Sequence, residues 1–187
     1  MLKYIEEFGK YVTITGFRNA KIADLQEFLK NTRKKESNVE IQFFDAKYIA
    51  TWQHLYFAVL NAFTAFRNNR CISKSLAMET MLYASTQRQI RKAMEILGIK
   101  SETSQIAVLI IGENSETVKS ALSMISATAR AQCNDKVLEL SEEKRRIIQE
   151  TFGISDSELK TVMKKDDLEE ALTSLIVERM ALTAIQR

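Results

Sequence analysis

The segment Gln42–Gly98 decides how this chain of 187 residues folds. It begins with the short apolar run QFFDA (Gln42–Ala46) and continues with TWQHLYFAVLNAFTAF (Thr51–Phe66), which is apolar on almost every side of a helix. A helix that is apolar all round belongs in the interior of a protein. We therefore predict a strand followed by a core helix that runs from about Thr51 to Asn68.

Two more helices are expected after the basic turn RNNRCISK (Arg67–Lys74). The apolar spacing predicts helices over Lys74–Ser85 and Gln87–Leu97. Gly98 follows the second of these and suits the left-handed conformation in which many helices end. The connections are short, which favours antiparallel packing of these three helices.

The segment before this insertion predicts a strand, a helix and a strand. Tyr11–Gly16 alternates polar and apolar residues, as a half-buried strand does. Lys21–Asn31 has the spacing of an amphipathic helix, and Val39–Phe44 is a second strand. The polar connection Asn31–Asn38 is expected to be a solvated loop.

The segment after the insertion repeats this order. Ile106–Ile111 is a continuous apolar run, which is typical of a central strand covered on both faces. A helix over Glu116–Thr128 and a short strand over Lys136–Leu140 are predicted to follow. The sequence thus predicts an α+β fold, with a mostly antiparallel sheet of about four strands. That sheet is built from two β-α-β units, with the helical insertion between them and C-terminal helices around it.

The C-terminal part of the chain is predicted to be helical. Ser141 caps one helix, which Gly153 closes, and Ser155 with Glu158 forms a capping box for a longer helix.

The longer helix can be interrupted near Asp166 and Asp167. Its last part, Ala171–Ile185, has a broad apolar stripe that either packs on its own domain or docks a partner. We expect a single domain over residues 1–187, with residues 154–187 as a helical extension.

Composition limits the class of protein. The chain is 45% apolar and 27% charged, which is ordinary for a globular protein, and no apolar run reaches the roughly 18 residues of a membrane span. The start MLKYIEEFGK has acids where a signal peptide needs apolar residues, and Cys71 and Cys133 stand in no metal-binding spacing. A cytoplasmic protein without a structural metal is expected.

No catalytic motif is present. The sequence has no P-loop, GxGxxG or GxSxG pattern, and its single histidine, His54, lies in the apolar helix, where a core role is expected. Glu79 is either a buried carboxylate with a raised pKa or the partner of an arginine such as Arg88. Asp45 is expected to form a turn or cap. A binding or regulatory protein without a cofactor is therefore favoured over an enzyme.

Positive charge is concentrated in one part of the chain. Residues 51–100 carry seven Lys or Arg and two Glu, a balance of +5, although the whole chain carries only +3. If the helices pack antiparallel, the two turns bring six of these cations to one edge. Arginine side chains at such an edge suit phosphate binding, because each guanidinium offers paired N–H donors. The alternative to a phosphate-binding site is a face that is only solvated. The six residues are Arg67, Arg70, Lys74, Arg88, Arg91 and Lys92.

Short motifs in this segment resemble the small regulatory subunit of the KEOPS complex, the family of the human PRPK-binding protein with archaeal and yeast counterparts. The matching residues are Phe44-Asp45-Ala46, His54-Leu55, Ala62, Ala65-Phe66, Glu79, Leu82-Tyr83, Arg88-Gln89-Ile90, Ala93 and Gly98-Ile99. The run Glu178–Leu182 resembles archaeal members, so the similarity spans the whole chain. Thr51 and Thr86 depart from the pattern, because small glycine-like residues are expected there.

The resemblance implies a non-catalytic subunit without bound metal or nucleotide. Members of this family bind the N-terminal lobe of a small atypical kinase/ATPase and stimulate it. They also help the complex hold tRNA by its 3′ CCA end, and through the kinase they join the other KEOPS subunits. The whole complex installs threonylcarbamoyl on the adenosine beside the anticodon.

Two surfaces follow as predictions. The six cations are expected to contact tRNA, and the kinase is expected to dock on the C-terminal helix around Leu172, Leu175, Ile176 and Leu182. Two alternatives stay open, a stand-alone RNA-binding protein and a small enzyme that acts on a phosphorylated substrate.

Overall fold

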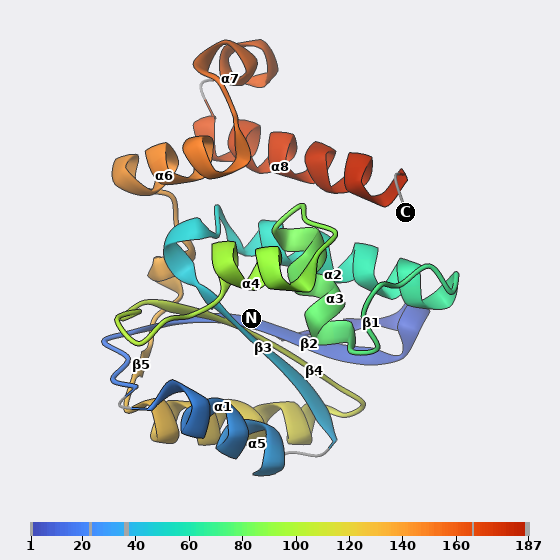
Figure 1. Cartoon of the computed structure of the whole chain (residues 1–187), viewed down its shortest axis with the longest axis vertical. Helices are drawn as coiled ribbons and strands as arrows, with labels where there is room; N and C mark the ends of the chain where they lie inside the picture. Colours follow the sequence, from blue (N-terminus) through green and yellow to red (C-terminus); the bar gives the residue numbers. More distant parts are fainter. Residues whose placement is uncertain (1, 23, 36–37, 166, 186–187) are drawn as a thin grey trace. The chain divides into compact units, whose positions relative to one another are not determined.

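The computed structural model describes residues 2–22, 24–35, 38–165 and 167–185 (Figure 1). Internal contacts divide the chain into two compact units. The first, here called the sheet unit, comprises Met1–Ala46 and Gly98–Val137, and the second, the helical unit, comprises Lys47–Leu97 and Leu138–Arg187. The single domain over residues 1–187 stays a prediction, and each unit is described by itself.

The sheet unit is built on antiparallel strands in the order β1-β2-β4-β3, with the short β5 also paired to β2. The strands are β1 (Leu2–Ile5), β2 (Lys10–Arg18), β3 (Val39–Asp45), β4 (Ile106–Gly112) and β5 (Gln132–Cys133). Ile110 of β4 pairs with Thr13 on one side and with Ile41 on the other. Since β2 and β3 are both antiparallel to β4, they are parallel to each other and enclose it. The predicted α+β class and the mostly antiparallel sheet are confirmed.

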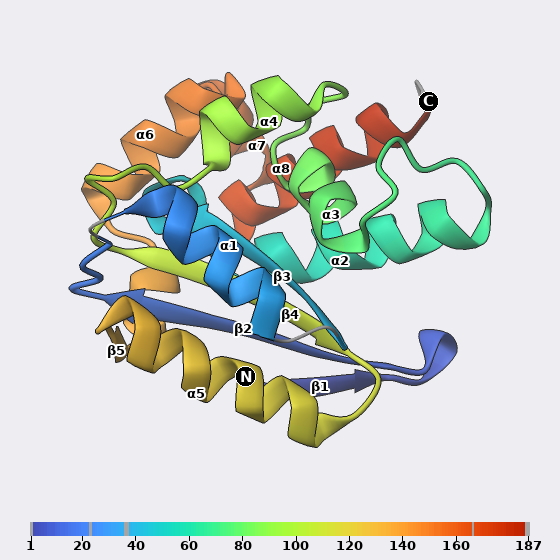
Figure 2. The same ribbon diagram turned by 60° about the horizontal axis from the view of Figure 1, so that its bottom comes forward.

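Two helices of this unit, α1 (Leu25–Lys35) and α5 (Ser115–Ala129), contact each other and the sheet (Figures 1 and 2). Phe28 from α1, Ile125 from α5 and Val108 from β4 belong to one buried apolar cluster. Every residue of β4 is buried, as the continuous apolar run predicts.

Three predictions for the sheet unit need correction. The N-terminal strand β1 was not expected, and it joins β2 through the 3-10 turn Glu6–Phe8, which Gly9 ends in the left-handed region. The predicted loop Asn31–Asn38 is helical through Lys35. Thr32 is buried there and its hydroxyl donates to the carbonyl of Phe28, so a polar residue is accommodated inside the helix.

The strand predicted at Lys136–Leu140 is wrong, because Asp135–Leu138 form a 3-10 helix and the strand is at Gln132–Cys133. Asp135 accepts hydrogen bonds from the Gly16 amide at 3.0 Å and the Thr15 hydroxyl at 2.7 Å. These bonds use the edge of β2 that a longer strand would need. A Cβ on Gly16 would meet the backbone carbonyl of Asn134 at 2.7 Å, so glycine permits this close approach.

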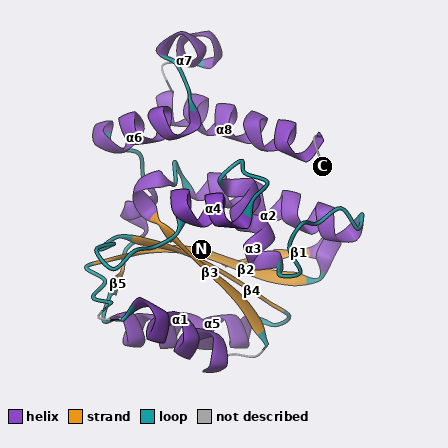
Figure 3. Cartoon of the chain, viewed as in Figure 1, coloured by secondary structure: helices purple, strands orange, loops and turns teal. Residues whose placement is uncertain are grey.

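The helical unit contains the remaining helices (Figure 3). They are α2 (Trp52–Arg67), α3 (Leu76–Ala84), α4 (Ile90–Leu97), α6 (Glu142–Phe152), α7 (Asp156–Val162) and α8 (Leu168–Ile185), and a 3-10 turn at Ala46–Tyr48 precedes α2. The centre of the unit is α2, which contacts both α3 and α8. Its alanines are closely packed, and Ala58 and Ala62 are completely buried. The predicted core helix is confirmed.

The helix caps follow the sequence signals, with one exception. The Ser155–Glu158 capping box is present, and Gly153 ends α6 in the left-handed region. Bonds from Ser155 and Arg179 lower the pKa of Glu158 to about 2. The predicted left-handed conformation at Gly98 is wrong, because among the described glycines only Gly9 and Gly153 have positive φ.

The long C-terminal helix is interrupted as predicted, since α7 ends at Val162 and α8 begins at Leu168. Asp167 lies just before α8 and accepts a hydrogen bond from the Glu170 amide, whereas Asp166 lies outside the described residues. No helix in the described ranges is long and apolar enough to cross a bilayer.

Candidate functional site

His54 is a packing residue of the helical unit. Its Nδ1 accepts a hydrogen bond from the Ala50 amide at 3.2 Å, so Nε2 carries the proton and donates to the Ala84 carbonyl at 2.9 Å. The ring also meets Phe152 edge-on. Burial lowers the pKa of His54 to about 4, although the bond to Ala84 opposes this shift. Both nitrogens are used and the ring is inaccessible, so the predicted core role is confirmed.

Glu79 organises the connection between α2 and α3. Its side chain is completely buried, and Oε2 accepts hydrogen bonds from the amides of Ile72 at 3.0 Å and Ser73 at 2.8 Å. Arg88 is exposed and forms no ion pair with a described residue, so Arg88 is not the arginine that pairs with Glu79. The carboxylate fixes the backbone next to two predicted cations, Arg70 and Lys74.

All six predicted cations lie in the helical unit and are exposed to solvent. The first three surround the α2–α3 connection, and the other three belong to the α3–α4 turn and to α4. The two groups therefore flank opposite ends of α3, whose nine residues span about 13 Å. The cations thus form two groups, one at each end of α3, whereas the sequence suggested that all six lie at one edge.

The six cations differ in whether their side chains already interact with other residues. Arg91 pairs with Glu95 at 2.9 Å one helical turn away, and Arg67 has interactions of its own. Four side chains form no hydrogen bond or ion pair with any described residue, and they are Arg70, Lys74, Arg88 and Lys92. These four offer the full donor capacity that a phosphate would use.

The four apolar residues predicted on α8 divide into buried and exposed ones. Leu172, Leu175 and Ile176 are buried, with 0%, 4% and 0% exposure, because α8 packs against α2 and α3. Leu182 is 53% exposed. The apolar stripe thus serves its own unit along most of its length and leaves the last turn open.

Exposed apolar side chains also stand on α4. Ile90 and Met94, four residues apart, are 39% and 45% exposed, and Ile185 at the end of α8 is 79% exposed. The Thr183 hydroxyl donates to the Thr86 carbonyl at 3.4 Å, which ties the end of α8 to the turn that leads into α4. We name Ile90, Met94, Leu182 and Ile185 the α4–α8 apolar surface. The apolar spacing of Ile90 and Met94 in the sequence is a signal for the α4 part of this surface.

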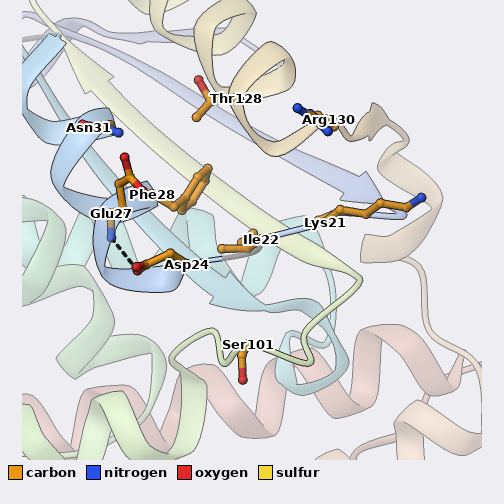
Figure 4. Close-up of a pocket in the computed structure, with 10 residues that line it drawn as sticks. Lys21, Ile22, Asp24, Glu27, Phe28, Asn31, Ser101, Thr128 and Arg130 are labelled. Carbon is orange, nitrogen blue, oxygen red and sulfur yellow. Dashed lines mark hydrogen bonds between the residues drawn. The ribbon is translucent and has the colours of Figure 1, made fainter.

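A cavity of about 510 Å³ lies in the sheet unit between the start of α1 and the end of α5 (Figure 4). Phe28 forms part of its floor, and the cations Lys21 and Arg130 share its walls with Asp24 and Glu27. Asp24 already accepts a hydrogen bond from the Glu27 amide and so caps the helix. With two charges of each sign, the cavity has no preference for either sign of ligand. Among the described residues, no three His, Cys, Asp or Glu side chains are grouped to hold a metal ion.

Comparison with known proteins identifies the family. Residues 17–184 match the family model for the kinase binding protein CGI-121. The chain is also 33% identical, over 141 residues, to the regulatory protein Cgi121 of Methanocaldococcus jannaschii. The aligned region covers 75% of this chain and 83% of that protein. The match to the family model includes both exposed groups of cations and nearly all of α8. The chain belongs to the CGI-121 family of kinase-binding proteins.

Proposed function

We propose that this chain is the non-catalytic, kinase-binding subunit of the KEOPS complex. It binds and activates the small atypical kinase/ATPase and helps bind the 3′ CCA end of tRNA, so that the complex threonylcarbamoylates the adenosine beside the anticodon in the cytoplasm. The observation that carries the proposal is the match to the kinase-binding family over residues 17–184. The same family description favours a regulatory protein over an enzyme.

The α4–α8 apolar surface is the place where we expect the kinase to dock. Exposed apolar side chains are used at interaction sites, and Leu182 and Ile185 lie at the end of the helix that the sequence singled out. Of the predicted kinase-binding residues, Leu182 would contact the partner. Leu172, Leu175 and Ile176 would hold α8 in place from inside.

The proposal is tested by mixing the purified chain with the purified kinase/ATPase of the same cell. A stable complex by size-exclusion chromatography, with faster ATP hydrolysis than the kinase shows alone, is expected. No complex at micromolar concentrations would exclude the kinase-binding role. Turnover of a phosphorylated substrate by the chain alone would favour the enzyme alternative.

The tRNA contact is tested at cations that have no partner in the described chain. The variant Arg88→Glu with Lys92→Glu should weaken tRNA binding by the assembled complex by at least about tenfold, and it should lower the salt slope by about two. The matched control is Arg146→Glu with Lys160→Glu, which reverses two exposed cations on α6 and α7. If both double variants bind tRNA with equal affinity, Arg88 and Lys92 are not part of the tRNA-binding surface.

A further inference from the structure

No further inference is drawn: the strongest candidate, the cavity of the sheet unit between the start of α1 and the end of α5, is walled by exposed charged side chains of both signs, and nothing in the structure shows what would occupy it.

Discussion

His54 is held neutral inside the helical unit, and this makes the stability of the protein depend on pH. Its pKa is about 4 in the folded chain and 6.5 when unfolded, so the unfolded state binds more protons between these values. Stability from this residue is therefore complete above pH 6.5 and is lost as the pH falls towards 4. The difference of about 2.5 units corresponds to about 3 kcal/mol.

We predict that the wild type loses about 3 kcal/mol more than His54→Gln between pH 7 and pH 4, because glutamine does not titrate. Urea unfolding at four pH values measures this. Other titrating groups, such as Glu158, remain in both proteins and cancel in the difference. Parallel stability curves for the two proteins would show that His54 does not cause the loss.

Thr86 is a strained residue at the end of α3. Its φ is +54°, a conformation in which a β-branched residue is rare, and the amides of Thr86 and Gln87 bond back to the carbonyls of Tyr83 and Leu82. This is the helix ending in which glycine is usual. The resemblance to the family suggested a glycine-like position here, and the backbone supplies the physical reason.

Thr86→Gly should raise the free energy of unfolding by about 1 kcal/mol, because glycine adopts positive φ without the clash of a Cβ. Denaturant titration provides the measurement. Arg146→Gly is the control, since Arg146 is exposed within α6, and glycine should cost about 1 kcal/mol there. A loss of stability in Thr86→Gly would mean that contacts of the threonine side chain outweigh the strain.

At the scale of elements, the α2–α3 connection depends on a single buried carboxylate. Glu79→Gln should lower stability by about 1–2 kcal/mol, since charge-assisted bonds to the Ile72 and Ser73 amides become neutral ones. Hydrogen exchange at these two amides should become about tenfold faster. Glu95→Gln, in an exposed pair with Arg91, should change stability by less than about 0.5 kcal/mol. Unchanged exchange at Ile72 and Ser73 in Glu79→Gln would contradict this role.

Elements with a strong apolar period could be predicted from the sequence. β3 and β4 begin where the pattern places them, and α2 agrees with its predicted ends to within one residue. The strand at Lys136–Leu140 could not be excluded, because Val137 and Leu138 are buried in an irregular turn as they would be in a strand. What decides against the strand is the contact of Asp135 with β2, which joins residues about 120 positions apart.

At the scale of the whole molecule, the sequence predicts the family and the helices, but its local pattern does not separate core from surface on α8. Leu175 and Leu182 are seven residues apart and both belong to the apolar stripe, yet one is buried and the other is open. The difference arises because α2 and α3 cover only part of α8. The local sequence pattern does not show which part of a helix its neighbours cover. The same limit applies to α4, where Ile90 and Met94 have apolar helical spacing and are nevertheless exposed.

This difference changes how the kinase-binding surface is tested. A charge at Leu175 would disrupt the helical unit from inside, so loss of binding in that variant would say nothing about the interface. A charge at Leu182 enters solvent and leaves the interior intact. Leu2 in β1 offers a matched control, because it is an exposed leucine at 38% in the sheet unit.

The most direct measurement is the dissociation constant of the kinase for three forms of the chain, by isothermal titration calorimetry. Leu182→Glu should weaken binding at least about thirtyfold, as the loss of a central interface residue does, while Leu2→Glu should bind like the wild type. Circular dichroism and thermal unfolding should be the same for all three. If folded Leu182→Glu binds the kinase as tightly as the wild type, the α4–α8 apolar surface is not where the kinase docks.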